Sequence, residues 1–187
     1  MTNAEREAAT ATALVAAAKM GDQRAFEALV KRYRKRIYAL ALHMTRSASE
    51  ADDIAQEVFL KAFRALPTFR GGADPGTWLY RIVYNTCLDA IRSDRRHAAE
   101  RFTDDEADRG STSASEQGAE EQLTDRSMLA SAFDNLAEDH KTVVWLIDVE
   151  GFDYNAAAEV FGIAPGTVGS RLFRAHAQLR AAMGGER

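Results

Sequence analysis

The chain has 187 residues, 46% of them hydrophobic, and a formal net charge of −4 at neutral pH. This length suits one large domain or two small ones, and the hydrophobic fraction is enough to fill their cores. It has no run of about eighteen apolar residues and no signal-peptide pattern, so we expect a cytoplasmic protein with no direct membrane insertion. The single cysteine, Cys87, excludes an internal disulfide and a cysteine-rich zinc site.

Three helices are predicted in the first half of the chain, after an alanine-rich and weakly patterned extension at residues 1–20. Asp22 can cap a first helix that runs to about Met44, with apolar residues at helical spacing. Ser49 and Asp52 form a capping-box pattern for a second helix, which is expected to end at Pro67. The second helix is expected to bury Ala51, Ile54, Ala55, Val58 and Ala62.

The opposite face of the second helix mixes carboxylates, an amide and a leucine. This stripe consists of Asp53, Gln56, Glu57, Leu60 and Arg64. It is either a solvated face or a protein-docking surface, because an apolar residue inside a polar stripe is typical of docking surfaces. No histidine lies near these carboxylates in the sequence, so we expect no metal site, cofactor or catalytic residue here; the histidines are His43, His97, His140 and His176.

A third helix is predicted over residues 77–92, after a loop that contains glycines and a proline. Its buried stripe is expected to be Leu79, Ile82, Val83, Thr86 and Ala90. Aromatic, arginine and amide side chains are expected on the remaining surface, namely Trp78, Tyr80, Arg81, Tyr84, Asn85 and Arg92. Such side chains can stack on unpaired bases and hold phosphates, although Trp78 alone could equally be a core residue.

Residues 96–124 are predicted to be a flexible linker, because they are acidic, poor in apolar residues and without a period. Without this segment the chain consists of residues 21–95, with a net charge of +4, and residues 125–187, with a net charge of −3 but with arginines on one predicted helix. The negative net charge therefore does not exclude binding to nucleic acid.

A helix-turn-helix is predicted near the C-terminus. Asp153 can cap a short helix over residues 154–161, Gly162 suits the turn, and Pro165 suits the first position of the next helix. Val168, Leu172, Ala175 and Leu179 form an apolar stripe on that helix, and its other face carries Thr167, Ser170, Arg171, Arg174 and Gln178. This face either reads DNA or is merely solvated.

Four segments, taken together and in order, resemble the extracytoplasmic-function (ECF) group of bacterial sigma factors of the sigma-70 type. They are residues 52–61 (DDIAQEVFLK), 69–71 (FRG), 77–86 (TWLYRIVYNT) and 166–175 (GTVGSRLFRA). The resemblance implies an all-α chain of two small helical domains joined by the acidic linker. These domains would be a region 2 bundle at residues 21–95 and a region 4 helix-turn-helix at residues 125–187.

The resemblance also implies roles for individual residues. The second-helix surface would bind core RNA polymerase through the clamp helices of its largest subunit, using Asp53, Gln56, Glu57 and Leu60. The loop and the third helix would recognise and open the minus-ten promoter element, using Phe69, Arg70, Trp78, Arg81 and Asn85. The recognition helix would read the minus-thirty-five element, using Thr167, Ser170, Arg171, Phe173 and Arg174.

The resemblance implies partners beyond the clamp helices and promoter DNA. These are the flap of the second-largest polymerase subunit and an anti-sigma factor, which could hold the protein at the inner membrane. Gly169 and Ile147 stand where members often have basic residues, so minus-thirty-five binding could differ here. A dimeric DNA-binding regulator and a protein-binding helical adaptor are the alternatives; the regulator does not need the second-helix stripe, and the adaptor does not need Arg171 and Arg174.

Overall fold

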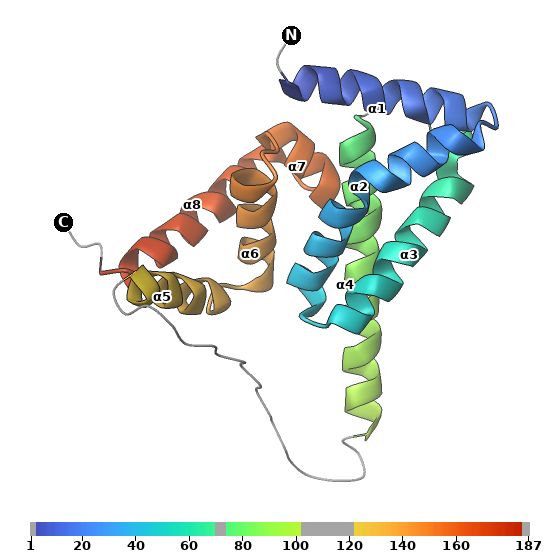
Figure 1. Ribbon diagram of the computed structural model, residues 1–187. Helices are drawn as coiled ribbons and strands as arrows, with labels where there is room; N and C mark the ends of the chain where they lie inside the picture. The colour runs from blue at the N-terminus through green and yellow to red at the C-terminus, as the bar shows by residue number, and fades with distance from the viewer. Residues whose placement is uncertain (1–2, 70–73, 102–121, 185–187) are drawn as a thin grey trace.

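The computed structural model describes residues 3–69, 74–101 and 122–184, and within these ranges every regular element is helical (Figure 1). The all-α prediction is therefore confirmed. The first half contains α1 (Asn3–Lys19), α2 (Gln23–Thr45), α3 (Ala48–Ala65), the 3₁₀ turn η1 (Leu66–Thr68) and α4 (Pro75–Arg101). The second half contains α5 (Gln122–Asp134), α6 (Glu138–Val144), the π-helical turn η2 (Trp145–Val149), α7 (Tyr154–Phe161) and α8 (Pro165–Ala182).

Local capping sets the beginnings of α2 and α3. Asp22 caps α2 as predicted, because its Oδ1 accepts a hydrogen bond from the Arg24 main-chain N–H at 2.9 Å. The prediction for α3 was wrong by two residues, since the cap is Ser47 rather than Ser49. The Ser47 hydroxyl accepts from the Glu50 main-chain N–H at 3.3 Å, which satisfies one of the free donors of the first turn.

The N-terminal extension forms α1, a helix that the sequence analysis did not predict. It packs on α2 and α4 of the first bundle and buries Ala11, Val15 and Ala18. These three residues follow the i, i+4, i+7 spacing of one helix face. Lys19 Nζ also donates a hydrogen bond to the Phe69 carbonyl oxygen at 2.9 Å, which ties the end of α1 to the loop before α4.

Helix α4 runs nine residues further than the predicted end at Arg92, to Arg101. The predicted linker at residues 96–124 thus overlaps the last turn of α4 and the first turn of α5, and its central part, residues 102–121, lies outside the described residues. All five side chains predicted for the buried face of α3 are buried. Of the five predicted for α4, Leu79, Val83 and Thr86 are buried, and Ile82 and Ala90 are half-buried.

The second half is built around the helix-turn-helix α7–α8. The Asp153 carboxylate accepts from the Ala156 main-chain N–H at 2.8 Å, and Gly162 ends α7 with a φ of +67°, so both predicted signals are confirmed. A left-handed conformation at this position favours glycine. The core between α6, α7 and α8 contains Val143, Val144, Ala157, Ala158, Val168, Leu172 and Ala175.

The two halves lie against each other in the structure, with α6 and α7 beside α2 and α4 (Figure 1). Leu146 and Val160 from the second half join the buried core of the first. This contact corrects the prediction that Tyr80 lies on the surface: its side chain is fully buried, with its ring centroid 4.8 Å from that of Phe152. Tyr84 likewise meets Phe161, at 5.0 Å between ring centroids.

Candidate docking and nucleic-acid interfaces

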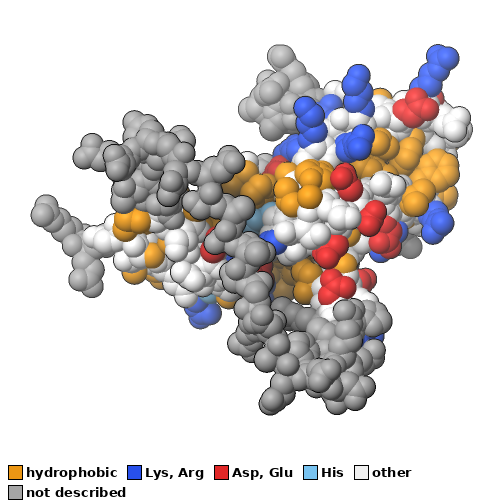
Figure 2. Space-filling view, turned by 60° about the horizontal axis from the view of Figure 1, so that its bottom comes forward, with side chains coloured by type: hydrophobic (Ala, Val, Ile, Leu, Met, Phe, Trp, Pro, Cys, Tyr) orange, Lys and Arg blue, Asp and Glu red, His pale blue; other side chains and the backbone are white. Residues whose placement is uncertain are grey.

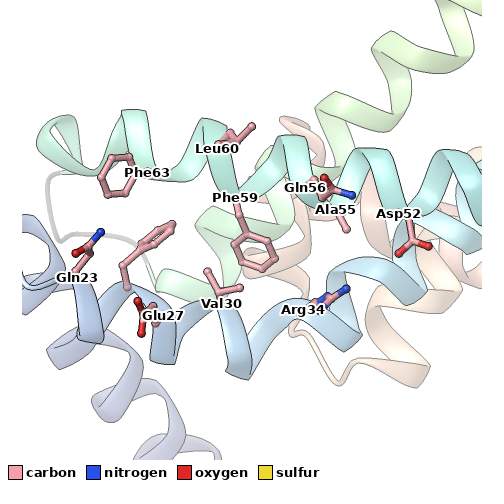
Figure 3. Close-up of a pocket in the computed structure, with 11 residues that line it drawn as sticks. Gln23, Glu27, Val30, Arg34, Asp52, Ala55, Gln56, Phe59, Leu60 and Phe63 are labelled. Atoms are coloured by element: carbon pink, nitrogen blue, oxygen red, sulfur yellow. The ribbon is translucent and has the colours of Figure 1, made fainter.

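A groove of about 610 Å³ lies between α2 and α3 on the first bundle (Figure 3). Its apolar lining comes from Phe26, Val30, Ala55, Phe59, Leu60 and Phe63, and its polar lining from Gln23, Glu27, Arg34, Asp52 and Gln56. Two large apolar side chains of the groove are exposed, with Leu60 58% and Phe63 53% accessible. Exposed apolar side chains beside charged ones also appear on the first bundle in Figure 2, and such an arrangement is typical of a protein-docking surface.

Only part of the predicted docking stripe lines this groove. Gln56 and Leu60 do, whereas Asp53 and Glu57 are exposed on α3 outside the lining. Glu57 instead forms an ion pair with Lys61 at 2.9 Å. Phe63 also lines the groove but was not predicted, although it follows Gln56 and Leu60 at the i, i+4, i+7 spacing of one helix face.

The residues predicted to act on the minus-ten element gather around the beginning of α4. Phe69 and Trp78 are half-buried, with ring centroids 4.9 Å apart, and both pack against the core of the first bundle. Arg81 and Asn85 are exposed one turn apart on α4. Arg70 lies outside the described residues. The arrangement leaves an arginine and an amide open to solvent beside a pair of packed aromatic rings, which suits contact with single-stranded bases.

The recognition helix α8 exposes most of its predicted reading face. Thr167, Ser170, Phe173 and Arg174 are all exposed, and Phe173 is 70% accessible although it is aromatic. Hydroxyl and guanidinium groups can reach base edges and phosphates, and a phenyl ring can contact a thymine methyl group.

Arg171 differs from the other predicted readers. Its side chain is only 26% exposed, and its Nε lies 3.3 Å from Oδ2 of Asp139 at the start of α6. The guanidinium is thus held beside the scaffold rather than projecting with Arg174. A second scaffold contact joins α8 to η2, where His176 Nε2 lies 2.6 Å from the Asp148 carboxylate.

An ion pair and several ring contacts join the two halves. Arg36 on α2 donates from Nε to the Glu150 carboxylate at 2.7 Å, and the Glu150 side chain is only 8% exposed. His43 on α2 stacks on Trp145, with ring centroids 4.7 Å apart and an interplanar angle of 20°. The contact therefore combines an ion pair and aromatic rings with buried apolar side chains such as Leu146 and Val160.

His43 occupies an unfavourable place for a charged ring. Burial lowers its pKa below the ordinary value, and the Lys141 and Arg46 side chains lower it further, although the Glu138 carboxylate and the Lys141 main chain oppose this. A cation stacked on an indole gains about 0.5–2 kcal/mol. An unpaired buried donor costs about 1–3 kcal/mol, and more when it is charged. The loss of hydration therefore outweighs the stacking on Trp145, and the pKa of His43 is lowered.

The described residues contain no group of three or more histidine, cysteine, aspartate or glutamate side chains able to hold a metal ion. Among the same residues, no helix is long and apolar enough to cross a membrane. Cys87 is buried in α4, and burial raises the pKa of its thiol to about 12.

Two family models match this chain. One described as "Sigma-70 region 2" matches residues 29–97, and one described as "Sigma-70, region 4" matches residues 126–179. The RNA polymerase sigma-H factor of Pseudomonas aeruginosa is 36% identical over 87% of this chain and 88% of its own length. The ECF sigma-E factor of Haemophilus influenzae is also 36% identical, over 90% of this chain and 93% of its own. The chain belongs to the ECF group of sigma factors.

Solved structures agree on the fold of this sigma factor. CnrH, in complex with the cytosolic domain of CnrY, superposes with a TM-score of 0.68 at 25% identity, over 95% of this chain and 99% of that one. RpoE of Bartonella quintana, in complex with the anti-sigma factor NepR, has a TM-score of 0.67 at 23% identity, over 87% of this chain and 98% of that one.

Proposed function

We propose that this sigma factor binds core RNA polymerase through the groove between α2 and α3, and directs initiation at promoters by reading the minus-ten element with α4 and the minus-thirty-five element with α8. The groove carries the proposal, because a DNA-binding regulator does not need an exposed apolar surface remote from its recognition helix. Leu60 and Phe63 are the exposed apolar groups of that groove. The clamp helices of the largest subunit are its occupant, and the flap of the second-largest subunit binds region 4.

The chain's own residues do no covalent chemistry in this proposal. Arg81 and Asn85 on α4 contact the separated strands, Phe69 and Trp78 form the aromatic support beside them, and phosphodiester bond formation belongs to the polymerase. On α8, Arg174 donates to a base edge or phosphate, Thr167 and Ser170 add hydroxyl contacts, and Phe173 supplies an apolar contact. Both surfaces are needed because neither domain alone specifies a start site.

An anti-sigma factor that restrains the chain in the cytoplasm is part of the proposal. It is supported by two structural relatives, CnrH and RpoE of Bartonella quintana, which were solved as complexes with the cytosolic domain of CnrY and with the anti-sigma factor NepR. The inducing signal would then act on the inhibitor or on its contact with this chain.

Run-off transcription with purified bacterial core polymerase tests the proposal, using the promoter upstream of the chain's own gene. We expect a specific transcript that requires this chain and is lost or strongly reduced with Arg174→Ala or Gln56→Ala. Arg180→Ala is the matched control, since Arg180 is exposed in the last turn of α8 away from the predicted readers. A transcript that is equally strong with Gln56→Ala and Arg174→Ala would contradict the assignment of both surfaces.

A further inference from the structure

The two halves of the chain touch, whereas the promoter elements assigned to them are far apart. By their names, the minus-ten and minus-thirty-five elements are separated by about 25 base pairs, or about 85 Å of B-form DNA. A compact chain of this length has a radius of gyration of about 16 Å. The halves must therefore separate before both elements are read together, a consequence that rests on the proposed function.

The surface that must separate contains buried polar atoms without hydrogen-bond partners. Within the described part of the chain, His43 Nε2 and Trp145 Nε1 are two such atoms, and their rings stack on each other across the two halves. Buried polar groups are normally hydrogen-bonded, and those left unpaired regain water when they are exposed. The contact is therefore suited to opening rather than to permanent closure.

His43 is the titratable side chain at the centre of the ring contacts. Its imidazole stacks on Trp145 of η2 and lies 5.5 Å from the ring of Phe133 of α5, measured between centroids. Histidine is the side chain whose charge changes near neutral pH. The contact between the halves therefore includes a ring whose ordinary pKa lies near neutral pH.

The charged groups around His43 do not provide a free counter-ion. Lys141 Nζ of α6 lies 2.9 Å from Glu138 Oε1, and Arg46 of α2 lies 3.6 Å from the same oxygen, so that carboxylate already serves two cations. Arg46 also lies 3.4 Å from Asp134 of α5. A proton on His43 would add a third cation to this cluster in a partly dehydrated place.

We propose that His43, held between Trp145 and Phe133, is a proton-sensitive latch, and that its protonation separates the two halves of the sigma factor. Burial lowers the pKa of His43 in the closed chain, while the open chain returns it to about 6.5. The closed form therefore binds fewer protons. The closed form is therefore most stable, relative to the open form, above about pH 6.5. As the pH falls further, the equilibrium constant for closure decreases by at most tenfold per pH unit, because one proton is involved.

Small-angle X-ray scattering of the full chain, without polymerase or DNA, tests the latch between about pH 8 and pH 5.5. Circular dichroism at each pH checks that the helices remain folded. We expect the radius of gyration to rise on acidification with helical content unchanged. His43→Phe keeps a ring for stacking but cannot titrate, so it should stay compact throughout, whereas His43→Arg should be open already at the higher pH.

The matched control is His176→Gln, since His176 is paired with Asp148 inside the second half and should leave the transition unchanged. Expansion of His43→Phe equal to that of the unmodified chain would overturn the proposal. So would a radius of gyration that does not change with pH, or a compact His43→Arg. Loss of helical content on acidification would also overturn it, because the change would then be unfolding. None of these results bears on run-off transcription, which tests the proposed function separately.

Discussion

The Arg36 guanidinium on α2 donates to the Glu150 carboxylate at 2.7 Å, across 114 positions of sequence. Arg36 keeps 42% of its side-chain exposure while Glu150 keeps 8%, so the acid is the partner that loses its water. The Arg36 guanidinium carbon also lies 5.9 Å from the centre of the Tyr80 ring. One arginine thus contacts an acid from the second half and an aromatic ring from the first at the place where they meet.

Removal of this ion pair should favour the open chain. Glu150→Gln and Arg36→Gln should each weaken closure, and a double-mutant cycle should give a coupling of about 1 kcal/mol, since Arg36 remains partly solvated. Scattering near pH 8 measures the closed fraction, and Lys61→Gln is a control that breaks an ion pair on α3 instead. Additive effects of the two substitutions would show that the pair does not contribute to closure.

Leu60→Ala should weaken binding to core polymerase about tenfold, because an exposed anchor in an apolar groove contributes to association but not to folding. Its unfolding free energy should change by less than about 0.5 kcal/mol. Competition for core polymerase measures the affinity. Met20→Ala is the matched control, since Met20 is 88% exposed and does not line the groove. Equal losses from both substitutions would contradict a specific role for the groove.

Gly169→Arg should strengthen binding to minus-thirty-five DNA. The site has room, since a Cβ at Gly169 would lie 3.7 Å from Tyr154 Cε2, which is ordinary contact. An added phosphate contact should steepen the slope of log affinity against log salt by about 1. Gly169→Ala is the control: it should gain about 1 kcal/mol of helix stability without a change in that slope. An unchanged slope for Gly169→Arg would place this position away from the DNA backbone.

Arg171 and Arg174 should contribute unequally to promoter binding. Arg174→Ala should cost about 1–3 kcal/mol of specific binding, because its side chain is exposed on the reading face. Arg171→Ala should cost less than about 1 kcal/mol, since its guanidinium is paired with Asp139. Fluorescence anisotropy with a minus-thirty-five duplex measures both. Equal losses would mean that Arg171 leaves Asp139 when DNA binds, and Asp139→Asn should then increase affinity.

Cys87 should be inert to thiol reagents in the folded chain. Burial raises the pKa of the thiol to about 12, so near pH 8 the reactive thiolate is about one part in ten thousand. Ellman's reagent should therefore modify it only after denaturant is added. Rapid modification of the folded chain would show that α4 separates from the bundle.

Local signals were sufficient where the structure depends on neighbouring residues. Asp22, Asp153 and Gly162 were predicted correctly because a cap or a left-handed turn uses groups within a few positions of one another. The error at Ser47 and Ser49 has the same origin, since two serines compete for one helix start and sequence alone does not choose between them. Half of the predicted docking surface, Gln56 and Leu60, lines the groove for a similar reason: helical spacing determines which side chains share a face.

The sequence by itself determined α2, α3, α4, the helix-turn-helix and the ECF family, but not α1, α5 or α6. Only the tertiary structure decided which helix faces meet: Tyr80 was expected at the surface and is fully buried against the second half. Likewise, the pairing of Arg36 with Glu150 and of His43 with Trp145 joins distant residues, and no periodicity encodes it. A helix pattern reports which face is apolar or aromatic, but the partner of that face depends on contacts made after the chain has folded.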